Sequence, residues 1–186
     1  FQPRVQRLFD ERRRATLPPS LLHAGAPLIG MHSRSGDKVY GSGLQPAEMA
    51  RIDAGRKLAF LNAAARQCAT HLEPGAHAFA AAYVATKDPA VLAAAQRAAG
   101  DGQLDAVQLI WDASVHRYGQ GFSTEDLVDG TLNGTREALD AMFDVEMLAS
   151  CAAFVGTFES NLSRLVMEIG AYRYNFVFRP LGVGKQ

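Results

Sequence analysis

The chain has 186 residues, and its 19 lysines and arginines balance its 19 aspartates and glutamates. This length indicates one domain, the alternative being two small ones, with enough residues for a hydrophobic core. The balanced charge creates no long-range attraction toward nucleic acid or an anionic membrane, so we expect neither as a partner. Cys68 and Cys151 are too few for a disulfide framework. We expect two buried thiols, the alternative being one bond between them.

The first 26 residues are predicted to be a helical extension or linker ahead of the main domain, residues 27–186. Within the extension, we interpret the run Arg12-Arg13-Arg14 as a solvated helix face. No stretch of the sequence approaches the roughly 20 apolar residues of a membrane-spanning helix. The chain begins at Phe1 without a signal-like segment, and we therefore expect that further residues once preceded it.

Short apolar runs alternate with longer amphipathic segments along the main domain, a pattern typical of strands and helices in turn. This alternation predicts an α/β fold, a Rossmann-like parallel sheet with helices on both faces. Residues 112–130 are rich in Gly, Ser and Asp and are interpreted as a loop. Alternating aromatic residues from Tyr172 to Phe178 suggest a half-buried strand. The other predicted strands are residues 27–31, 78–86, 106–111 and 153–157, and the predicted helices are residues 45–72, 88–100, 135–150 and 160–170.

Polar residues gather in three loops of this predicted fold. In open α/β sheets, ligands bind outside the carboxyl ends of the strands. That rule selects residues 31–38, 86–89 and 157–161. We expect a binding site where these loops meet.

The first of these loops reads His32-Ser33-Arg34-Ser35-Gly36-Asp37-Lys38. An arginine at this place can bind two phosphate oxygens at once, and glycine lets backbone amides approach an anion. A histidine at a strand end can donate to a phosphate or to a base edge. The alternative, left open by composition alone, is a surface loop with a solvated Asp37 and Lys38.

A second constellation reads Gly156-Thr157-Phe158-Glu159-Ser160-Asn161 at the start of a predicted helix. Free amides and the helix dipole make such a place suitable for anions. The alternative is an ordinary helix cap formed by Ser160, and both descriptions can hold together.

Two aspartates remain ambiguous from the residues alone. Asp144 lies among apolar neighbours in a predicted helix and can accept two hydrogen bonds from a guanine edge. Without other information, an exposed helix position is the favoured interpretation of Asp144. Asp88 either contributes to the site or caps the helix that follows it.

Several familiar motifs do not occur in the sequence. The histidines show no metal-ligand spacing, so a metal site is not expected. The sequence contains neither GxGxxG nor GxxxxGK[ST], which argues against a dinucleotide fingerprint or a P-loop.

Four longer motifs follow one another along the chain. They are Gly30-Met-His32-Ser-Arg34-Ser-Gly-Asp37-Lys38, Tyr83-Val-Ala-Thr86-Lys87-Asp88-Pro89, Phe143-Asp144-Val-Glu-Met-Leu148 and Phe154-Val-Gly-Thr157-Phe-Glu-Ser160-Asn-Leu-Ser163-Arg164-Leu. In this order they resemble the α-1,6-fucosyltransferases, whose relatives include bacterial nodulation-factor fucosyltransferases. The resemblance covers residues 27–170, nearly the whole chain. It implies a GT-B glycosyltransferase whose Rossmann-like half binds GDP-fucose.

The resemblance also implies roles for individual residues. It suggests that His32 and Asp144 lie near the guanosine, and that Arg34 binds the β-phosphate and, with Lys38, serves catalysis. The diphosphate would be held by the start of the last predicted helix, and the donor pocket would be organised by further polar residues. Those additional donor-binding residues are Asp37, Asp88, Thr157, Ser160 and Asn161.

The implied reaction is an inverting transfer of fucose from GDP-fucose to a glycan or glycoprotein acceptor, as in core fucosylation of N-glycans. No metal or other cofactor is expected, so cationic side chains and helix-end amides would stabilise the leaving diphosphate. The resemblance suggests the Golgi lumen. The acceptor-binding half of a GT-B enzyme is expected outside this chain, because residues 1–26 are too few to form it.

The sequence departs from the family pattern at several positions. Ser35 stands where a second arginine is often found, and Lys87 stands where an aspartate is common. Gly41-Ser42-Gly43 replaces an acidic residue of the general-base relay, for which Glu48 is a possible substitute. Glu159 replaces a small hydroxyl residue and would repel a diphosphate unless turned away. The alternatives are therefore a non-catalytic binding or structural module and an enzyme resembling peptide O-fucosyltransferases.

Overall fold

The computed structural model describes ten stretches of the chain, and every structural statement below concerns them. The strands are β1 (Leu28–Ser33), β2 (Ala81–Thr86), β3 (Gln108–Ile110) and β4 (Ala153–Val155). The helices are α1 (Pro3–Thr16), α2 (Pro19–His23), α4 (Pro89–Gly100), α5 (Thr124–Val128), α6 (Gly134–Ala149) and α7 (Asn161–Tyr174). The described residues are 2–23, 27–33, 55–56, 58–59, 62, 79, 81–102, 108–118, 124–156 and 160–174.

The four strands form one parallel sheet in the order β3-β2-β1-β4. The chain moves outward from β1 to β2 and β3, and then returns to the opposite side of β1 to form β4. Gly30 in the middle of β1 pairs with Tyr83 of β2 and with Phe154 of β4. This order confirms the predicted Rossmann-like α/β class, and it places the reversal of strand order between β1 and β4.

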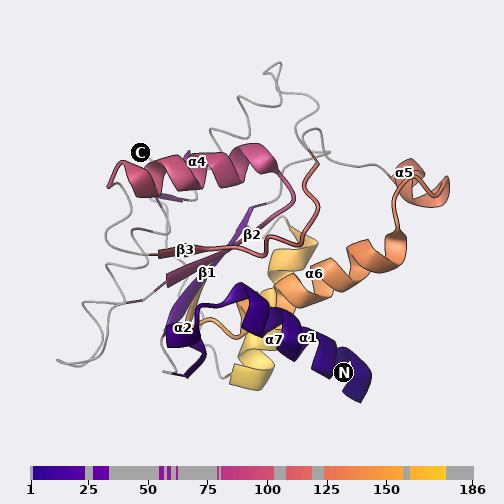
Figure 1. Cartoon of the computed structure of the whole chain (residues 1–186), viewed down its shortest axis with the longest axis horizontal. Coiled ribbons are helices and arrows are strands. Elements are labelled where there is room, and N and C mark those ends of the chain that lie inside the picture. The colour runs from indigo at the N-terminus through magenta and orange to yellow at the C-terminus, as the bar shows by residue number, and fades with distance from the viewer. Residues whose placement is uncertain are drawn as a thin grey trace.

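Helices cover both faces of the sheet (Figure 1): α4 lies on one side, and α1, α6 and α7 lie on the other. Successive strand residues point to opposite faces. Ile29 and Val84 accordingly belong to the apolar cluster under α4, whereas Leu28 and Tyr83 belong to the cluster under α6. Burial on both faces explains why all residues of β1 and β2 are buried.

Local sequence signals fix the helix ends. Pro3 occupies the first turn of α1, and Leu17 is extended because it precedes Pro18. Asp88 caps α4 by accepting a 2.7 Å hydrogen bond from the Ala90 amide. Asn133 caps α6 in the same way, through the Arg136 amide.

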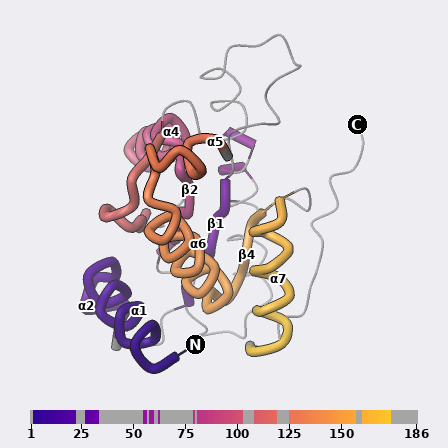
Figure 2. The backbone as a smooth tube through the Cα atoms, turned by 90° about the vertical axis from the view of Figure 1, so that its right-hand side faces the viewer, coloured from indigo at the N-terminus to yellow at the C-terminus, as the bar shows by residue number. Residues whose placement is uncertain are grey.

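Helices α1 and α2 lie in the first 26 residues, and α1 packs against the rest of the fold (Figure 2). Phe9 is buried in the cluster under α6 and contacts the Phe143 ring edge to face, with ring centroids 5.7 Å apart. Arg12 is directed inward beside it, over the Phe143 ring. The predicted solvated face therefore holds for Arg14, which is exposed, and is wrong for Arg12.

Two further differences concern element bounds. Residues 124–128, within the predicted loop, form the short helix α5. The last predicted helix continues to Tyr174 because Gly170, interpreted as its end, is a buried helical position. The strand predicted from Tyr172 onward is therefore wrong at its start, and Tyr172 is exposed on α7. Residues 175–186 lie outside the described part.

Other predictions fall partly on residues that are not described. Residues 55–56, 58–59 and 62 are helical, in agreement with the helix predicted over residues 45–72. Cys151 is a free, buried thiol, whereas Cys68 lies outside the described residues. Among the helices described here, none combines the length and apolar character needed to cross a membrane.

Candidate functional site

The carboxyl end of β1 and the first turn of α7 meet between β1 and β4. The Nδ1 atom of His32, at the carboxyl end of β1, lies 2.8 Å from Ser163 Oγ in the first turn of α7. These residues are separated by 131 positions in the sequence, and both are buried. The contact therefore joins the first predicted loop to the start of the last helix, at the reversal of strand order where α/β sheets bind ligands.

Ser160 lies immediately before α7 at this same place. Its side chain is only 3% exposed, and its Oγ atom takes part in no hydrogen bond with the described residues. A buried hydroxyl without a partner is costly, which suggests that it bonds to something else. We call His32, Ser160 and Ser163 the switch-point site.

The switch-point site favours anion binding over nucleophilic catalysis. Ser163 is fully buried inside a helix, so its hydroxyl holds the His32 ring and is not exposed to attack a substrate. The first amides of the 14-residue helix α7 lack helical acceptors, and the helix dipole makes this end positive. Amide donors, a hydroxyl and an imidazole together suit phosphate oxygens.

Several predicted site residues cannot be placed. Arg34, Asp37, Lys38 and Thr157 lie outside the described residues, so their roles remain predictions. Asn161 is the first residue of α7, is exposed, and accepts a hydrogen bond from the Arg164 guanidinium.

Asp88 has the capping role that was one of its two interpretations. Its carboxylate accepts from the Ala90 amide, and its own amide donates to Thr86 Oγ1 at 3.1 Å. The Asp88 side chain lies at the carboxyl edge of β2 and is buried. This arrangement fixes the loop after β2.

Asp144 lies inside the fold, so the expectation of an exposed helix position is wrong. It is 6% exposed, and its Oδ1 atom accepts a 2.6 Å hydrogen bond from the Tyr83 hydroxyl. Burial raises the pKa of Asp144 to about 6, although the Tyr83 hydrogen bond and the charges of Lys87 and Arg12 act in the opposite direction. Burial, together with the Asp144 charge and hydrogen bond, raises the pKa of Tyr83 well above its ordinary value.

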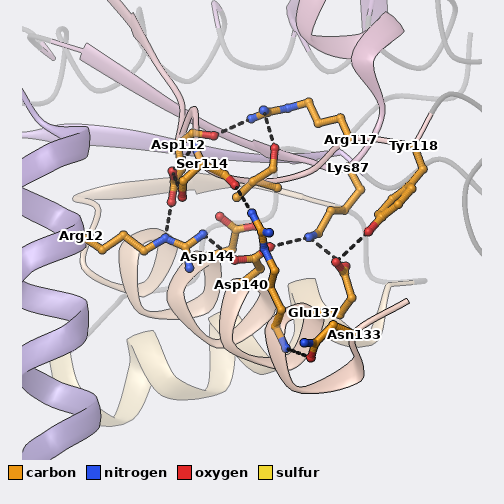
Figure 3. Close-up of polar contacts among 12 residues, drawn as sticks. Arg12, Lys87, Asp112, Ser114, Arg117, Tyr118, Asn133, Glu137, Asp140 and Asp144 are labelled. Carbon is orange, nitrogen blue, oxygen red and sulfur yellow. Dashed lines mark hydrogen bonds and ion pairs between the residues drawn. The ribbon is translucent and has the colours of Figure 1, made fainter. Parts of the chain in front are cut away.

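Around Asp144, an ionic network joins α1, α6 and the carboxyl ends of β2 and β3 (Figure 3). Arg12 of α1 pairs with Asp112, which follows β3, and with Asp140 of α6 at 2.7 Å. Lys87, which follows β2, binds Asp140 and Glu137, each at 3.0 Å. Two cations thus hold three carboxylates, and Asp140 is shared between them.

The segment after β3 completes the network. Asp112 accepts hydrogen bonds from both the amide and the hydroxyl of Ser114. The Tyr118 hydroxyl donates to Glu137 at 2.8 Å, and the Tyr118 amide donates to the Lys87 carbonyl. These bonds fix the segment over the ends of β2 and β3.

Sequence reasoning did not identify Ser163, Tyr83 or the network. One signal was available: Glu137, Asp140 and Asp144 have the i, i+3, i+7 spacing of one helix face. These three acidic residues share a face of α6 with the apolar Phe143. Acidic residues on an apolar helix face indicate buried carboxylates that require hydrogen-bond donors. The partners Arg12 and Asp112 are remote in sequence, and no local pattern identifies them.

No model of a known protein family matches this sequence, and no curated protein matches it either. Within the described part of the chain, no cluster of three or more His, Cys, Asp or Glu side chains is arranged to hold a metal ion. The case for a function therefore depends on the residues and geometry of this chain.

Arg12→Ala should destabilise the fold by about 3 kcal/mol, because it leaves Asp112 and Asp140 buried with fewer donors. The Arg12 side chain is only 15% exposed, which limits the compensation that water can provide. The exposed Arg14→Ala, two positions later, is the matched control and should change stability by less than about 0.5 kcal/mol. Urea denaturation of both variants measures the difference, and equal stabilities would contradict a structural role for Arg12.

Asp144→Asn should change how stability depends on pH. The folded pKa of about 6 lies above the ordinary value of 3.8, so the native state binds more protons between these two pH values. Stability from this group is therefore fully present below pH 3.8 and is lost as pH rises toward 6. The asparagine side chain does not titrate, so the variant does not show this loss. The free energy of unfolding of the variant minus that of the parent should therefore rise by about 2 to 3 kcal/mol from pH 4 to pH 7.

Denaturation at several pH values, with the exposed Asp101→Asn as control, measures this effect. A stability difference between the Asp144→Asn variant and the parent that does not vary with pH would mean that the Asp144 carboxylate titrates as an ordinary exposed one.

Proposed function

We propose that this chain is the donor-binding domain of an inverting glycosyltransferase of the GT-B type that transfers fucose from GDP-fucose to a glycan acceptor. The observation that supports this most is the 2.8 Å contact between His32 and Ser163. It brings the histidine of one predicted diphosphate-binding segment onto the helix that follows the other. The resemblance to α-1,6-fucosyltransferases supplies the identity of the sugar and the nucleotide, and also suggests the Golgi lumen.

The switch-point site is suited to the diphosphate. Ser160 Oγ has no described partner, and the amides at the start of α7 are directed out of the helix end. Phosphate oxygens would satisfy these donors, and the helix dipole would favour the negative charge. His32, held by Ser163, lies at the carboxyl end of β1 beside this helix end, so its imidazole would contribute to the polar surface around the diphosphate.

Transfer also requires stabilisation of the leaving group. The acceptor hydroxyl oxygen forms a bond to C1 of fucose while the bond from C1 to the β-phosphate oxygen breaks and GDP leaves with the electron pair. Arg34 and Lys38, directly after β1 in sequence, are proposed to meet the charge that develops on GDP. The hydroxyl proton passes to a base, for which Glu48 is the candidate in sequence.

The base of the nucleotide would be read by Asp144. An ionised carboxylate accepts hydrogen bonds from the N1–H and the 2-amino group of guanine, donors that neither adenine nor uracil presents in the same pattern. Among the described residues, only Tyr83 donates to Asp144, and it donates to one oxygen. The second oxygen remains for a ligand donor.

A binding module without transfer activity is the second candidate. It is favoured by Gly41-Ser42-Gly43, which stands where the family has an acidic residue, and by Glu159, an acidic residue directly before Ser160 in the sequence where the family has a small hydroxyl residue. The two candidates share nucleotide binding and differ in turnover. A radiolabelled fucose-transfer assay with the full-length protein separates them.

Calorimetric titration with GDP, GDP-fucose, UDP and ADP, with and without a chelator, tests the shared claim. We expect saturable binding that is selective for guanine nucleotides and does not depend on a metal. Ser160→Ala should weaken GDP binding by roughly 10- to 100-fold, which corresponds to one hydrogen bond to a charged group. Arg34→Ala should weaken GDP binding sharply, abolish transfer and leave the fold intact.

Ser150→Ala is the matched control for these variants. Ser150 follows the end of α6 and bonds to the Met147 carbonyl, at the amino edge of the sheet. GDP binding should be unchanged in this variant. Failure of the folded parent to bind any guanine nucleotide would contradict the proposed function.

A further inference from the structure

Tyr83 is a buried polar residue at the centre of the sheet. It lies in the middle of β2, is fully buried, and shares the row facing α6 with Ala81 and Ala85. A phenylalanine ring would fill the same space beneath α6. The described partner of its hydroxyl is Asp144 Oδ1, at 2.6 Å. The hydroxyl therefore acts on Asp144, beyond the packing that the ring provides.

The other oxygen of Asp144 is differently placed. The described residues supply no hydrogen bond to Oδ2, although the side chain as a whole is 6% exposed. Buried carboxylates are normally bonded through both oxygens, because an open acceptor in a low dielectric is costly. An open Oδ2 beside a filled Oδ1 suggests a carboxylate arranged for one further donor.

Charged groups from several elements lie around the hydrogen-bonded pair of Tyr83 and Asp144 without bonding to Asp144. Arg12 from α1 and Lys87 after β2 stabilise its ionised form, while Asp112 after β3 disfavours that form. Asp140, one turn earlier on α6, is held by both cations. These neighbours act through charge alone, so Tyr83 is the described residue that orients the carboxylate.

We propose that Tyr83 is the positioning residue for Asp144: its hydroxyl fixes Oδ1, so that Oδ2 is the oxygen that receives an N–H donor of the bound nucleotide base. This inference rests on the proposed function, in which Asp144 reads the guanine edge. The inference adds that Tyr83 sets the orientation of the Asp144 carboxylate and favours its ionised form.

A consequence concerns the pH at which the site binds. Only the ionised carboxylate accepts from a donor at either oxygen, and the Tyr83 hydrogen bond favours that form. Without the hydroxyl, the Asp144 pKa should rise further. Nucleotide binding would then be lost at a higher pH than in the parent protein.

The experiment is calorimetric titration with GDP-fucose from pH 5 to pH 8, using the parent, Tyr83→Phe and Tyr118→Phe. GDP-fucose is the suitable probe because its diphosphate is esterified at both ends and lacks the phosphate ionisation near pH 6 that monoesters have. Tyr118→Phe is the matched control, since it also removes a hydroxyl that donates to a carboxylate of α6.

We expect parent affinity to fall about tenfold per pH unit below the Asp144 pKa, as linkage to one proton requires. Tyr83→Phe should move the midpoint of this loss upward by about one pH unit, the equivalent of one hydrogen bond. Tyr118→Phe should leave the midpoint unchanged. A lost packing contact would lower affinity at every pH without moving the midpoint.

The outcomes separate this inference from the proposed function. If all three proteins bind GDP-fucose with the same midpoint, the role of Tyr83 is wrong and nucleotide binding stands. If the folded parent binds no GDP-fucose, the proposed function fails and this inference fails with it. Should Tyr83→Phe not fold, Asp144→Asn serves instead: it should bind more weakly and lose the pH dependence, and an unchanged profile would overturn the inference.

Discussion

The burial of three carboxylates on the inner face of α6 is the constraint around which neighbouring segments are arranged. Glu137, Asp140 and Asp144 face the sheet, where an ionised carboxylate without donors is strongly unfavourable. Each carboxylate is bonded to a different donor: Glu137 to Lys87 at the end of β2, Asp140 to Arg12 of α1, and Asp144 to Tyr83 in the middle of β2. The N-terminal helix is thereby tied to the carboxyl edge of the sheet.

Two polar regions on the α6 side of the sheet carry the buried groups that the proposal uses. In the ionic network, carboxylates and cations bond to one another across α1, α6 and the strand ends, while Asp144 Oδ2 beside it has no described donor. At the switch-point site, His32 is held by Ser163 while the nearby Ser160 hydroxyl lacks a described partner. Ion-paired networks rigidify a fold, whereas unsatisfied buried groups indicate a ligand. These two open groups are why we assign the diphosphate to the region between β1 and β4 and the base to Asp144.

Much of the fold followed from local patterns in the sequence. The buried runs of β1 and β2, and the Asp88 cap before Pro89, predicted strands and a helix close to those observed. Two predictions from local sequence were wrong. Gly170 was expected to end a helix but is a buried position inside α7, and Arg12 was expected to be solvated but forms an ion pair with Asp112. Both failures have one cause: tertiary neighbours decide whether a glycine ends a helix or an arginine is solvated.

The candidate site was only partly predictable. The strand-end rule placed His32 and the start of α7 at one edge, and the structure brings these two together. The choice of Ser163 as the partner of His32, and of Tyr83 as the partner of Asp144, depends on side-chain directions that sequence spacing does not specify. Ion pairs such as Arg12 with Asp112, which are 100 positions apart, need the folded arrangement to be seen.

The central claim is that a guanine nucleotide binds between β1 and β4, and amide chemical shifts recorded by two-dimensional NMR during a GDP titration test it most directly. The account predicts saturable shifts concentrated in the backbone amides of His32, Ser33 and the first turn of α7, with little change near Cys151 at the opposite edge of the sheet. Shifts that saturate around Cys151 while α7 stays unaffected would contradict it.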